Sequence, residues 1–243
     1  MNELADRVAA LADRYGLPGA AAKLAMLLEL VASEPLAPTR VREPSRVLDD
    51  HLADSLVALE FEQVRSARRI ADLGAGAGFP GLPLAIALPD ADVALIESSG
   101  RKCAFMARAI EACRVANARA VQARAESWAE GREACDLVTA RALASLEVVA
   151  EYAAPLLTVG GSLVVWRGRR DRDAESIGAA AAAELGLEVE AIRSVRPYAG
   201  AEHRHLHLIS KMAPTPLGFP RRPGMAQKRP LGHGRAASDR VRR

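Results

Sequence analysis

The residues best suited to chemistry are glycines at alternate positions behind a short apolar stretch. The sequence there reads Asp72-Leu-Gly74-Ala-Gly76-Ala-Gly78-Phe79-Pro80-Gly81, and an apolar run over 82–88 follows. Glycine adopts positive φ without a steric penalty and, having no Cβ, lets a ligand touch the backbone. A strand, a glycine turn and a helix in this order bring a nucleotide-like ligand against backbone N–H groups.

The spacing of these glycines fits two ligand classes. Gly76-x-Gly78-x-x-Gly81 matches the dinucleotide fingerprint. Asp72-x-Gly74-x-Gly76-x-Gly78 matches the acidic glycine loop of S-adenosylmethionine (SAM)-dependent methyltransferases. A turn that only connects a strand to a helix is a third interpretation, so the residues after the next strands must separate the three.

Acidic and basic residues follow the later strands. Glu97 ends the second strand, where a carboxylate can accept both hydroxyls of a ribose, whether of NAD or of SAM. Ala125-Glu126 follows the third strand, where methyltransferases hold an adenine with a backbone N–H and an acid. Glu126 also suits the first turn of a helix, where an acid complements the helix dipole.

Arg141 lies just past the fourth strand and His51 lies on a helix near the N-terminus. The carboxyl ends of parallel strands face the ligand crevice. Arg141 is therefore expected to pair with the cofactor carboxylate, to meet RNA phosphate, or to form a structural salt bridge. His51 is expected to be a structural histidine hydrogen-bonded to Asp54, with a proton shuttle as the alternative.

Strands and helices alternate from residue 68 onward, which predicts right-handed βαβ units and a sheet covered on both sides. Strands are expected at Arg68–Leu73, Asp92–Glu97, Ala118–Gln122, Asp136–Ala140, Ser162–Trp166, Glu188–Val195 and His205–Ile209, and helices at Leu82–Leu88, Arg101–Arg114, Leu146–Leu157 and Arg172–Leu185. The last two strands have no helix between them and are predicted to form a hairpin-like pair at the end of the sheet. The fold class is therefore α/β, a Rossmann-like sheet of the SAM-dependent methyltransferase type, mostly parallel with its last strand antiparallel.

Three regions are expected along the chain. Residues 1–66 form an N-terminal helical cap, with apolar stripes predicting helices at Met1–Tyr15, Pro18–Ala32 and Ser45–Val64. Residues 67–212 form the SAM-binding domain. Residues 213–243 contain five prolines and are expected to form an extended arm without a helix, partly disordered at its end.

Charge is concentrated in the C-terminal arm. It holds eight Lys or Arg residues and one acid, a formal charge of +7, although the whole chain carries only +3. A mildly acidic body with a basic arm predicts a polyanionic partner for the arm. The proposed phosphate contacts are Arg221, Arg222, Lys228 and Arg229; the alternative is a solvated arm without a partner.

Composition excludes several other classes. No apolar run approaches the roughly 20 residues that a membrane-spanning helix needs, and the N-terminus lacks the apolar stretch of a signal peptide. Cys103, Cys113 and Cys135 have spacings that suit no zinc site, so buried free thiols are expected. The chain is expected to be cytoplasmic and monomeric, without a metal.

Taken together, these motifs resemble the bacterial ribosomal RNA small-subunit methyltransferase G family, also called glucose-inhibited division protein B. The resemblance runs from about Arg40 to Leu231. Its motifs are His51-x-x-Asp54-Ser55, the glycine loop ending in Pro80-Gly81, Arg141-Ala-x-Ala-Ser145, Trp166-Arg167-Gly168, Arg204-His-Leu and Pro223-Gly-x-x-x-Lys228-x-Pro230-Leu231. Two departures are Ala37-Pro38-Thr39, where the family has Asn-Leu-Thr, and Arg167, where it usually has lysine.

The resemblance implies a function and a set of site residues. The implied reaction is methylation of N7 of a guanosine in 16S ribosomal RNA, with free RNA or the small ribosomal subunit as the partner. The implied contacts to SAM are Gly74, Gly76, Phe79, Glu97, Ala125, Glu126 and Arg141. Because guanine N7 attacks with a lone pair and has no proton to lose, no general base is expected.

Two alternatives remain from the residues alone. An NAD(P)-dependent oxidoreductase is favoured by Gly76-x-Gly78-x-x-Gly81 together with Glu97, and is disfavoured by Asp72 and Glu126. A non-catalytic ribosomal RNA-binding assembly factor with the same fold is the second. The intact glycine loop of this chain argues against the assembly-factor interpretation.

Overall fold

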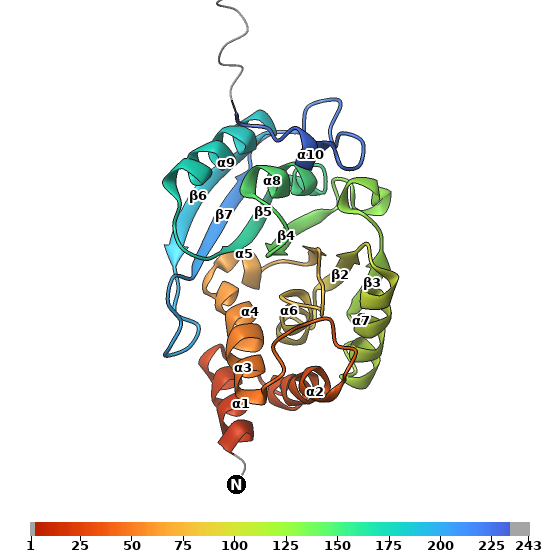
Figure 1. Ribbon diagram of the computed structural model, residues 1–243, viewed down its shortest axis with the longest axis vertical. Coiled ribbons are helices and arrows are strands. Elements are labelled where there is room, and N and C mark those ends of the chain that lie inside the picture. The colour runs from red at the N-terminus through yellow and green to blue at the C-terminus, as the bar shows by residue number, and fades with distance from the viewer. Residues whose placement is uncertain (1–2, 234–243) are drawn as a thin grey trace, which may run out of the picture.

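The computed structural model describes residues 3–233 of the 243-residue chain. This part of the chain forms one sheet of seven strands in the order β3-β2-β1-β4-β5-β7-β6 (Figure 1). The strands are β1 Arg69–Leu73, β2 Asp92–Glu97, β3 Ala118–Gln122, β4 Cys135–Arg141, β5 Leu157–Arg167, β6 Leu187–Ser194 and β7 His205–Lys211. β7 runs antiparallel to both of its neighbours, whereas β1 to β5 pair in parallel. The predicted mostly parallel sheet with a reversed last strand is confirmed.

Strand order reverses direction at β1. β1 pairs with β2 on one side and with β4 on the other, and the chain beyond each extends the sheet away from this point. In open α/β sheets, ligands bind outside the carboxyl ends of the strands at such a switch point. The fold therefore brings the glycine loop after β1 beside the residues that follow β2 and β4.

Apolar side chains of neighbouring strand residues alternate between two cores. Ile70 and Leu137 belong to one core, and Ala71 and Val138 belong to the other, because successive strand residues point to opposite faces. α6 Gly81–Ala87 and α7 Gly100–Ala112 pack on the first face, and α8 Leu146–Ala153 and α9 Arg172–Glu184 pack on the second. These helices lie close to their predicted positions.

The N-terminal helices join the first core. α1 Glu3–Arg14 and α2 Ala20–Ser33 bury Val8, Leu24 and Leu27 in the same cluster as the sheet residues, and α2 contacts α6 and α7. Figure 1 shows these helices below the carboxyl ends of the parallel strands. They therefore cover the first face of the sheet domain through α6 and α7.

The single helix predicted over 45–64 is wrong in detail. It is divided into α3 Pro44–Val47, a π-helical turn η1 Leu48–Ala53, α4 Asp54–Leu56, a 3-10 turn η2 Val57–Glu60 and α5 Glu62–Arg65. Ser55 Oγ donates to the His51 carbonyl at 2.5 Å, and Trp166 Nε1 donates to the Asp54 carbonyl at 2.6 Å. The first bond engages a carbonyl within the π-helical turn and the second engages the carbonyl of the residue that follows it. π-Helical turns are frequently found at functional sites.

The C-terminal segment also differs from the prediction of an arm without a helix. α10 Met225–Lys228 occupies the interval between Pro223 and Pro230, where each backbone N–H is free to donate. Ala226 is 2% exposed in the second core, and α10 contacts α8 (Figure 1). Residues 213–233 are therefore folded against the sheet domain. The expected disorder at the end of the arm falls on residues 234–243, outside the described range.

The three cysteines are buried free thiols, as predicted. No cluster of three or more His, Cys, Asp or Glu side chains placed to hold a metal ion is found among residues 3–233. Within the same residues, no helix has the length and apolar character to cross a membrane.

Gly81 is predicted to be required for stability because α6 lies so close to the strands. A Cβ at this position would lie 2.2 Å from Leu95 Cδ2 and 2.8 Å from Asp72 Oδ2. We expect Gly81→Ala to lower the free energy of unfolding by about 1–3 kcal/mol, as in other overpacked cores. Urea denaturation followed by circular dichroism measures this.

Gly200→Ala is the matched control, since a Cβ there meets nothing within 4 Å. Its free energy of unfolding should stay within about 0.5 kcal/mol of the wild-type value. Equal effects of the two substitutions would contradict the packing argument.

Candidate functional site

The glycine loop is held in place by one buried carboxylate. Asp72 Oδ2 accepts from the Gly81 backbone N–H and Oδ1 accepts from the Thr139 hydroxyl, both at 2.9 Å. Asp72 is 0% exposed, and burial raises its pKa to about 7, although these two donors and Arg141 act in the opposite direction. The carboxylate therefore ties β1 to β4 and to the start of α6.

The loop itself takes the conformation that its glycines allow. Gly74, Gly76 and Gly78 have φ of 67°, 61° and 93°, in the left-handed region that favours glycine. A Cβ at Gly76 would meet only the Gly74 carbonyl oxygen, at 3.7 Å, so the space above this residue is open. A ligand can approach the backbone here.

Two neighbouring cavities lie at the carboxyl ends of the strands. The first, which we term the strand-end cavity, has a volume of about 310 Å³ and follows β1, β2 and β3. The second, the cap-side cavity, has a volume of about 450 Å³ and lies between the N-terminal helices and the ends of β4 and β5. Ala142 lines both. A larger apolar groove of about 530 Å³ between α1 and α2 lies away from the strand ends.

Glu97 lines the strand-end cavity with its carboxylate in charged form. It accepts from the Ser99 N–H at 2.9 Å and from Lys102 Nζ at 3.3 Å. Burial alone would raise the pKa of Glu97, but the Ser99 N–H, the Lys102 ammonium and the Gly76 N–H together hold it below its ordinary value. An anionic acceptor therefore stands next to the glycine loop.

Ala125 and Glu126 line the same cavity from the 3-10 turn η3 Ala125–Ser127. Glu126 Oε1 accepts from the Gly224 backbone N–H at 3.1 Å. Burial raises the pKa of Tyr152 to about 12, and the neighbouring Glu126 adds to this effect. The wall of the cavity thus includes the C-terminal segment, which sequence reasoning assigned only to RNA.

Arg141 forms the salt bridge that was one of its three interpretations. Its Nη1 donates to Asp54 Oδ2 at 2.8 Å and to the Asp50 carbonyl at 3.1 Å. Its guanidinium carbon lies 5.6 Å from the centre of the Phe79 ring. Arg141 lines the cap-side cavity and not the strand-end cavity. Through Phe79 and Asp54 it connects the glycine loop to the π-helical turn and the residue that follows it.

His51 stacks on Phe79, with ring centres 4.5 Å apart and planes inclined by 20°. Its Nε2 lies 2.8 Å from Thr39 Oγ1 and its Nδ1 lies 3.2 Å from the Asp50 carbonyl. The expected hydrogen bond to Asp54 is therefore wrong, because Arg141 takes that carboxylate. Burial, together with Arg141, lowers the pKa of His51 to about 4, so the ring is neutral at pH 7.

Further polar groups line the cap-side cavity. Arg204 lies 3.5 Å from Asp54 Oδ1 and 3.7 Å from Asp50 Oδ1, and the Tyr198 hydroxyl donates to Asp50 at 2.5 Å. Arg167 also lines the cavity, and its Nη1 donates to the Ala144 carbonyl. The position of Arg204 was signalled in the sequence only by its motif, because its partners are about 150 residues away in the chain.

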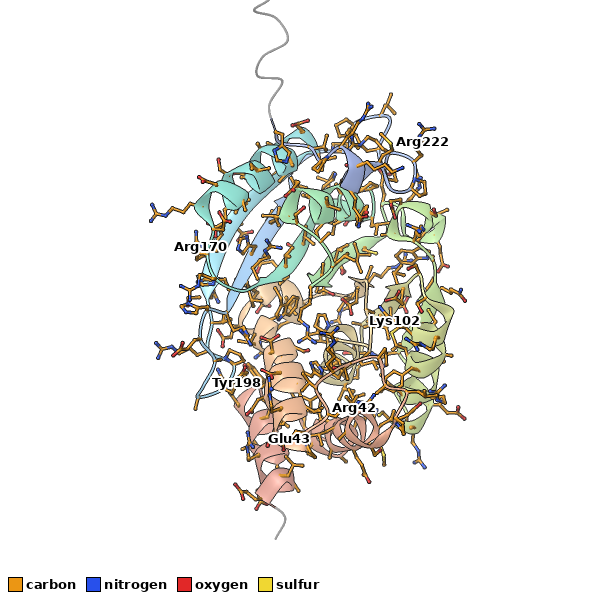
Figure 2. All side chains as sticks on the ribbon, in the orientation of Figure 1. Arg42, Glu43, Lys102, Arg170, Tyr198 and Arg222 are labelled. Atoms are coloured by element: carbon orange, nitrogen blue, oxygen red, sulfur yellow. The ribbon has the colours of Figure 1, made fainter. Side chains whose placement is uncertain are left out.

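The four cations that the sequence suggested as phosphate contacts have different environments. Arg221 donates through Nε to Glu151 at 2.8 Å and pairs with it a second time through Nη2, and Glu151 is 1% exposed. Arg222, Lys228 and Arg229 are exposed. Arg222 lies at the outer edge of the molecule in Figure 2. Arg221 thus anchors the segment, and the other three face solvent.

Comparison with known proteins adds the family context. A family model described as rRNA small subunit methyltransferase G matches residues 22–206. The ribosomal RNA small subunit methyltransferase G of Rubrobacter xylanophilus is 43% identical, covering 79% of this chain and 76% of the relative. That of Chloroflexus aggregans is 41% identical over 79% of this chain and 82% of the relative.

Solved structures show the same sheet. A predicted O-methyltransferase from Agrobacterium tumefaciens has a TM-score of 0.52 and 29% identity, covering 68% of this chain and 81% of its own. The Methanococcus jannaschii fibrillarin pre-rRNA processing protein has a TM-score of 0.51 and 15% identity, covering 65% and 74%. The fold is therefore that of the Rossmann-like methyltransferases.

Asp72 is predicted to make stability depend on pH. Its pKa rises from 3.8 to about 7 on folding, so between these values the native state binds more protons than the unfolded state and wild-type stability falls as pH rises. Asp72→Asn should lack this loss, because its Oδ1 can accept from Gly81 and its Nδ2 can donate to Thr139.

The difference in unfolding free energy between Asp72→Asn and the wild type should therefore grow from about pH 4 to about pH 7. Denaturation at several pH values measures it, with Asp90→Asn, at an exposed carboxylate, as the background. Parallel pH curves for the wild type and Asp72→Asn would refute the assignment.

Proposed function

The chain belongs to the ribosomal RNA small subunit methyltransferase G family, and from this premise we propose that it transfers a methyl group from SAM to N7 of a guanosine in 16S ribosomal RNA. The observation that carries the proposal is the strand-end cavity. Gly74 of the left-handed glycine loop lines it, together with Glu97 at the end of β2 and Glu126 in the turn after β3. This combination of backbone and carboxylate acceptors suits a nucleoside.

The residues present fit SAM. The open space above Gly76 admits a ligand against the loop, and the volume of about 310 Å³ lies at the lower end of the range for small-molecule sites. Glu97 would accept the two ribose hydroxyls. The backbone of Ala125 and the carboxylate of Glu126 would hold the adenine, and Gly74 and Gly76 would lie against the amino-acid portion.

Arg141 and Phe79 have a different part in this proposal. Both hydrogens of Arg141 Nη1 are used by Asp54 and Asp50. Phe79 contacts both the His51 ring and the guanidinium, which are themselves neighbours, with Arg141 Nη2 3.4 Å from His51 Nδ1. We therefore assign them a positioning role at the boundary between the two cavities. They fix the glycine loop relative to the π-helical turn, so that the two reactants meet at one place.

The target base would enter the cap-side cavity. This cavity adjoins the strand-end cavity at Ala142. Its lining carries charges of both signs: cations such as Arg204, and the carboxylates of Asp50 and Asp54. A charged wall of this kind can hold a polar base together with its phosphates. Because side chains cannot reach N7 in the deep major groove of A-form RNA, the substrate is an open loop or a partly assembled subunit.

The chemistry requires positioning rather than proton transfer. SAM supplies a methyl group on a positively charged sulfur. The chain holds the lone pair of N7 in line with that methyl at near-attack distance, and the carboxylates of Asp50 and Asp54 favour the positive charge that develops on the base. His51 is neutral and has partners at both ring nitrogens, so it is not needed as a base.

The two alternatives make different predictions for binding and turnover. An NAD(P)-dependent oxidoreductase would bind NAD(P) in preference to SAM, and calorimetry with both compounds separates them. A non-catalytic assembly factor would bind ribosomal RNA without modifying it. Transfer of tritium from methyl-labelled SAM to 16S RNA, followed by mapping of the modified base, distinguishes such a factor from the proposed methyltransferase.

Glu97 is predicted to be a main determinant of SAM affinity. Removing an ionised acceptor of two hydroxyls should raise the Kd of Glu97→Ala for SAM by roughly tenfold to a hundredfold, since hydrogen bonds to charged groups contribute about 1.5–3 kcal/mol. Isothermal titration calorimetry measures the change. Glu188→Ala, at an exposed position on β6, should bind SAM as the wild type does; equal Kd values for all three proteins would argue against this site.

The exposed cations of the C-terminal segment are predicted to bind RNA phosphates. Alanine at Arg222, Lys228 or Arg229 should weaken binding to 16S RNA and lower the slope of log K against log salt by about 1 for each phosphate that is no longer neutralised. Filter binding across a salt series measures both. Arg132→Ala, at an exposed residue before β4, is the control. Unchanged slopes in all three variants would exclude this surface.

A further inference from the structure

We propose that Gln227 is a further SAM-binding residue, whose carboxamide recognises the amine-bearing edge of the adenine. The inference rests on the proposed function, because it takes the nucleoside of SAM to occupy the strand-end cavity. It adds a contact from the C-terminal segment, apart from β2, which supplies Glu97, and from the turn after β3, which supplies Glu126. The segment thereby gains a role that its basic composition does not suggest.

Gln227 lies at the adenine end of the strand-end cavity. It lines this cavity together with Ala125, Glu126 and Tyr152, the residues that follow β3 or face it from α8. Ribose recognition at Glu97 places the base toward these residues, one strand further along the sheet. The Gln227 side chain therefore borders the space that the base would occupy.

The Gln227 carboxamide is available for a ligand. It is exposed, and no hydrogen bond to it is found within residues 3–233. A carboxamide carries one acceptor and two donor hydrogens, and glutamine pairs with adenine through the N6 amine and N7. The carboxylate of Glu126, which lines the same cavity, also accepts hydrogen bonds from an amine. The two side chains together provide acceptors for an exocyclic amine.

The backbone around Gln227 is fixed on both sides. Gly224 donates to Glu126 at 3.1 Å, Ala226 is buried in the second core, and the Arg229 N–H donates to the Met225 carbonyl at 2.9 Å. A side chain on a fixed turn loses less conformational freedom when it binds. Gln227 is thus placed in advance rather than brought in by the ligand.

Two anchors hold the whole segment against the domain. Arg221 pairs with the buried Glu151, and its Nη2 also donates to the Arg229 carbonyl at 2.9 Å. Gly232 lies so close to α9 that a Cβ would be 2.2 Å from the Ile177 carbonyl oxygen. Breaking a buried ion pair costs several kcal/mol, so the segment is a stable wall of the cavity.

The test compares two ligands that differ at the amine. S-adenosylhomocysteine carries it, and S-inosylhomocysteine has an oxygen in its place. We expect Gln227→Ala to raise the Kd for the adenosyl compound about three- to tenfold, the value of one ordinary hydrogen bond, and to leave the Kd for the inosyl compound within about twofold. Titration calorimetry gives both values without requiring turnover.

Gln227→Leu separates recognition from filling of the wall. It keeps the bulk of the side chain and removes its hydrogen bonds, so we expect the same loss of adenosyl preference as in Gln227→Ala. Gln63→Ala on α5, far from the cavity, is the matched control and should bind both ligands as the wild type does. Thermal unfolding by circular dichroism verifies that each variant is folded.

Distinct results would overturn the inference. A Gln227→Leu variant with wild-type preference for the adenosyl compound would show that only the bulk of the side chain matters. Equal losses for both ligands would likewise exclude recognition of the amine. A folded wild type that binds neither compound would refute the proposed function itself, and this inference with it. A wild type that binds both, with variants that show no selective loss, would refute this inference alone.

Discussion

The carboxylate of Asp72 is the constraint on which the geometry of the site depends. It is fully buried, yet each of its oxygens has a partner, the Gly81 N–H on one and the Thr139 hydroxyl on the other. Burying a carboxylate is costly unless it is hydrogen-bonded, so the strand, its neighbour and the helix can relax only together. The glycine loop between them is therefore held in its left-handed shape.

A second network connects the loop to the N-terminal helices. Arg141 joins Asp54 to the Phe79 ring, and His51 stacks on that ring with its Nδ1 3.4 Å from Arg141 Nη2. Trp166 completes the network by donating to the Asp54 carbonyl at the π-helical turn. Because these groups come from β4, β5, the loop and the cap, the two cavities keep one relative position. A positioning mechanism needs such rigidity more than it needs an acid or a base.

Local patterns in the sequence were sufficient for the glycine loop, for Glu97 and for most strands, since periodicity and glycine spacing reflect the backbone directly. The interruption at residues 48–53 could not be read in this way. The residue that follows it, Asp54, has its carbonyl bound by Trp166, which is more than a hundred residues away in the chain. The same holds for Arg141, whose choice among three partners was decided by Asp54, and for the C-terminal segment, where basic composition concealed the buried Ala226 and the Arg221–Glu151 pair.

Ala142 lines both cavities, and its φ of 53° is unusual for a residue other than glycine. Its side chain is a single methyl group at the place where the two cavities adjoin, and it has no reactive chemistry of its own. Bulk added here would act as a spacer: each molecule could still occupy its own compartment, but their reacting atoms would be kept apart. Displacements of about 1 Å are enough to slow a reaction a hundredfold. In the proposed reaction, the size of the side chain at position 142 would therefore affect the rate of transfer independently of how tightly either molecule is held.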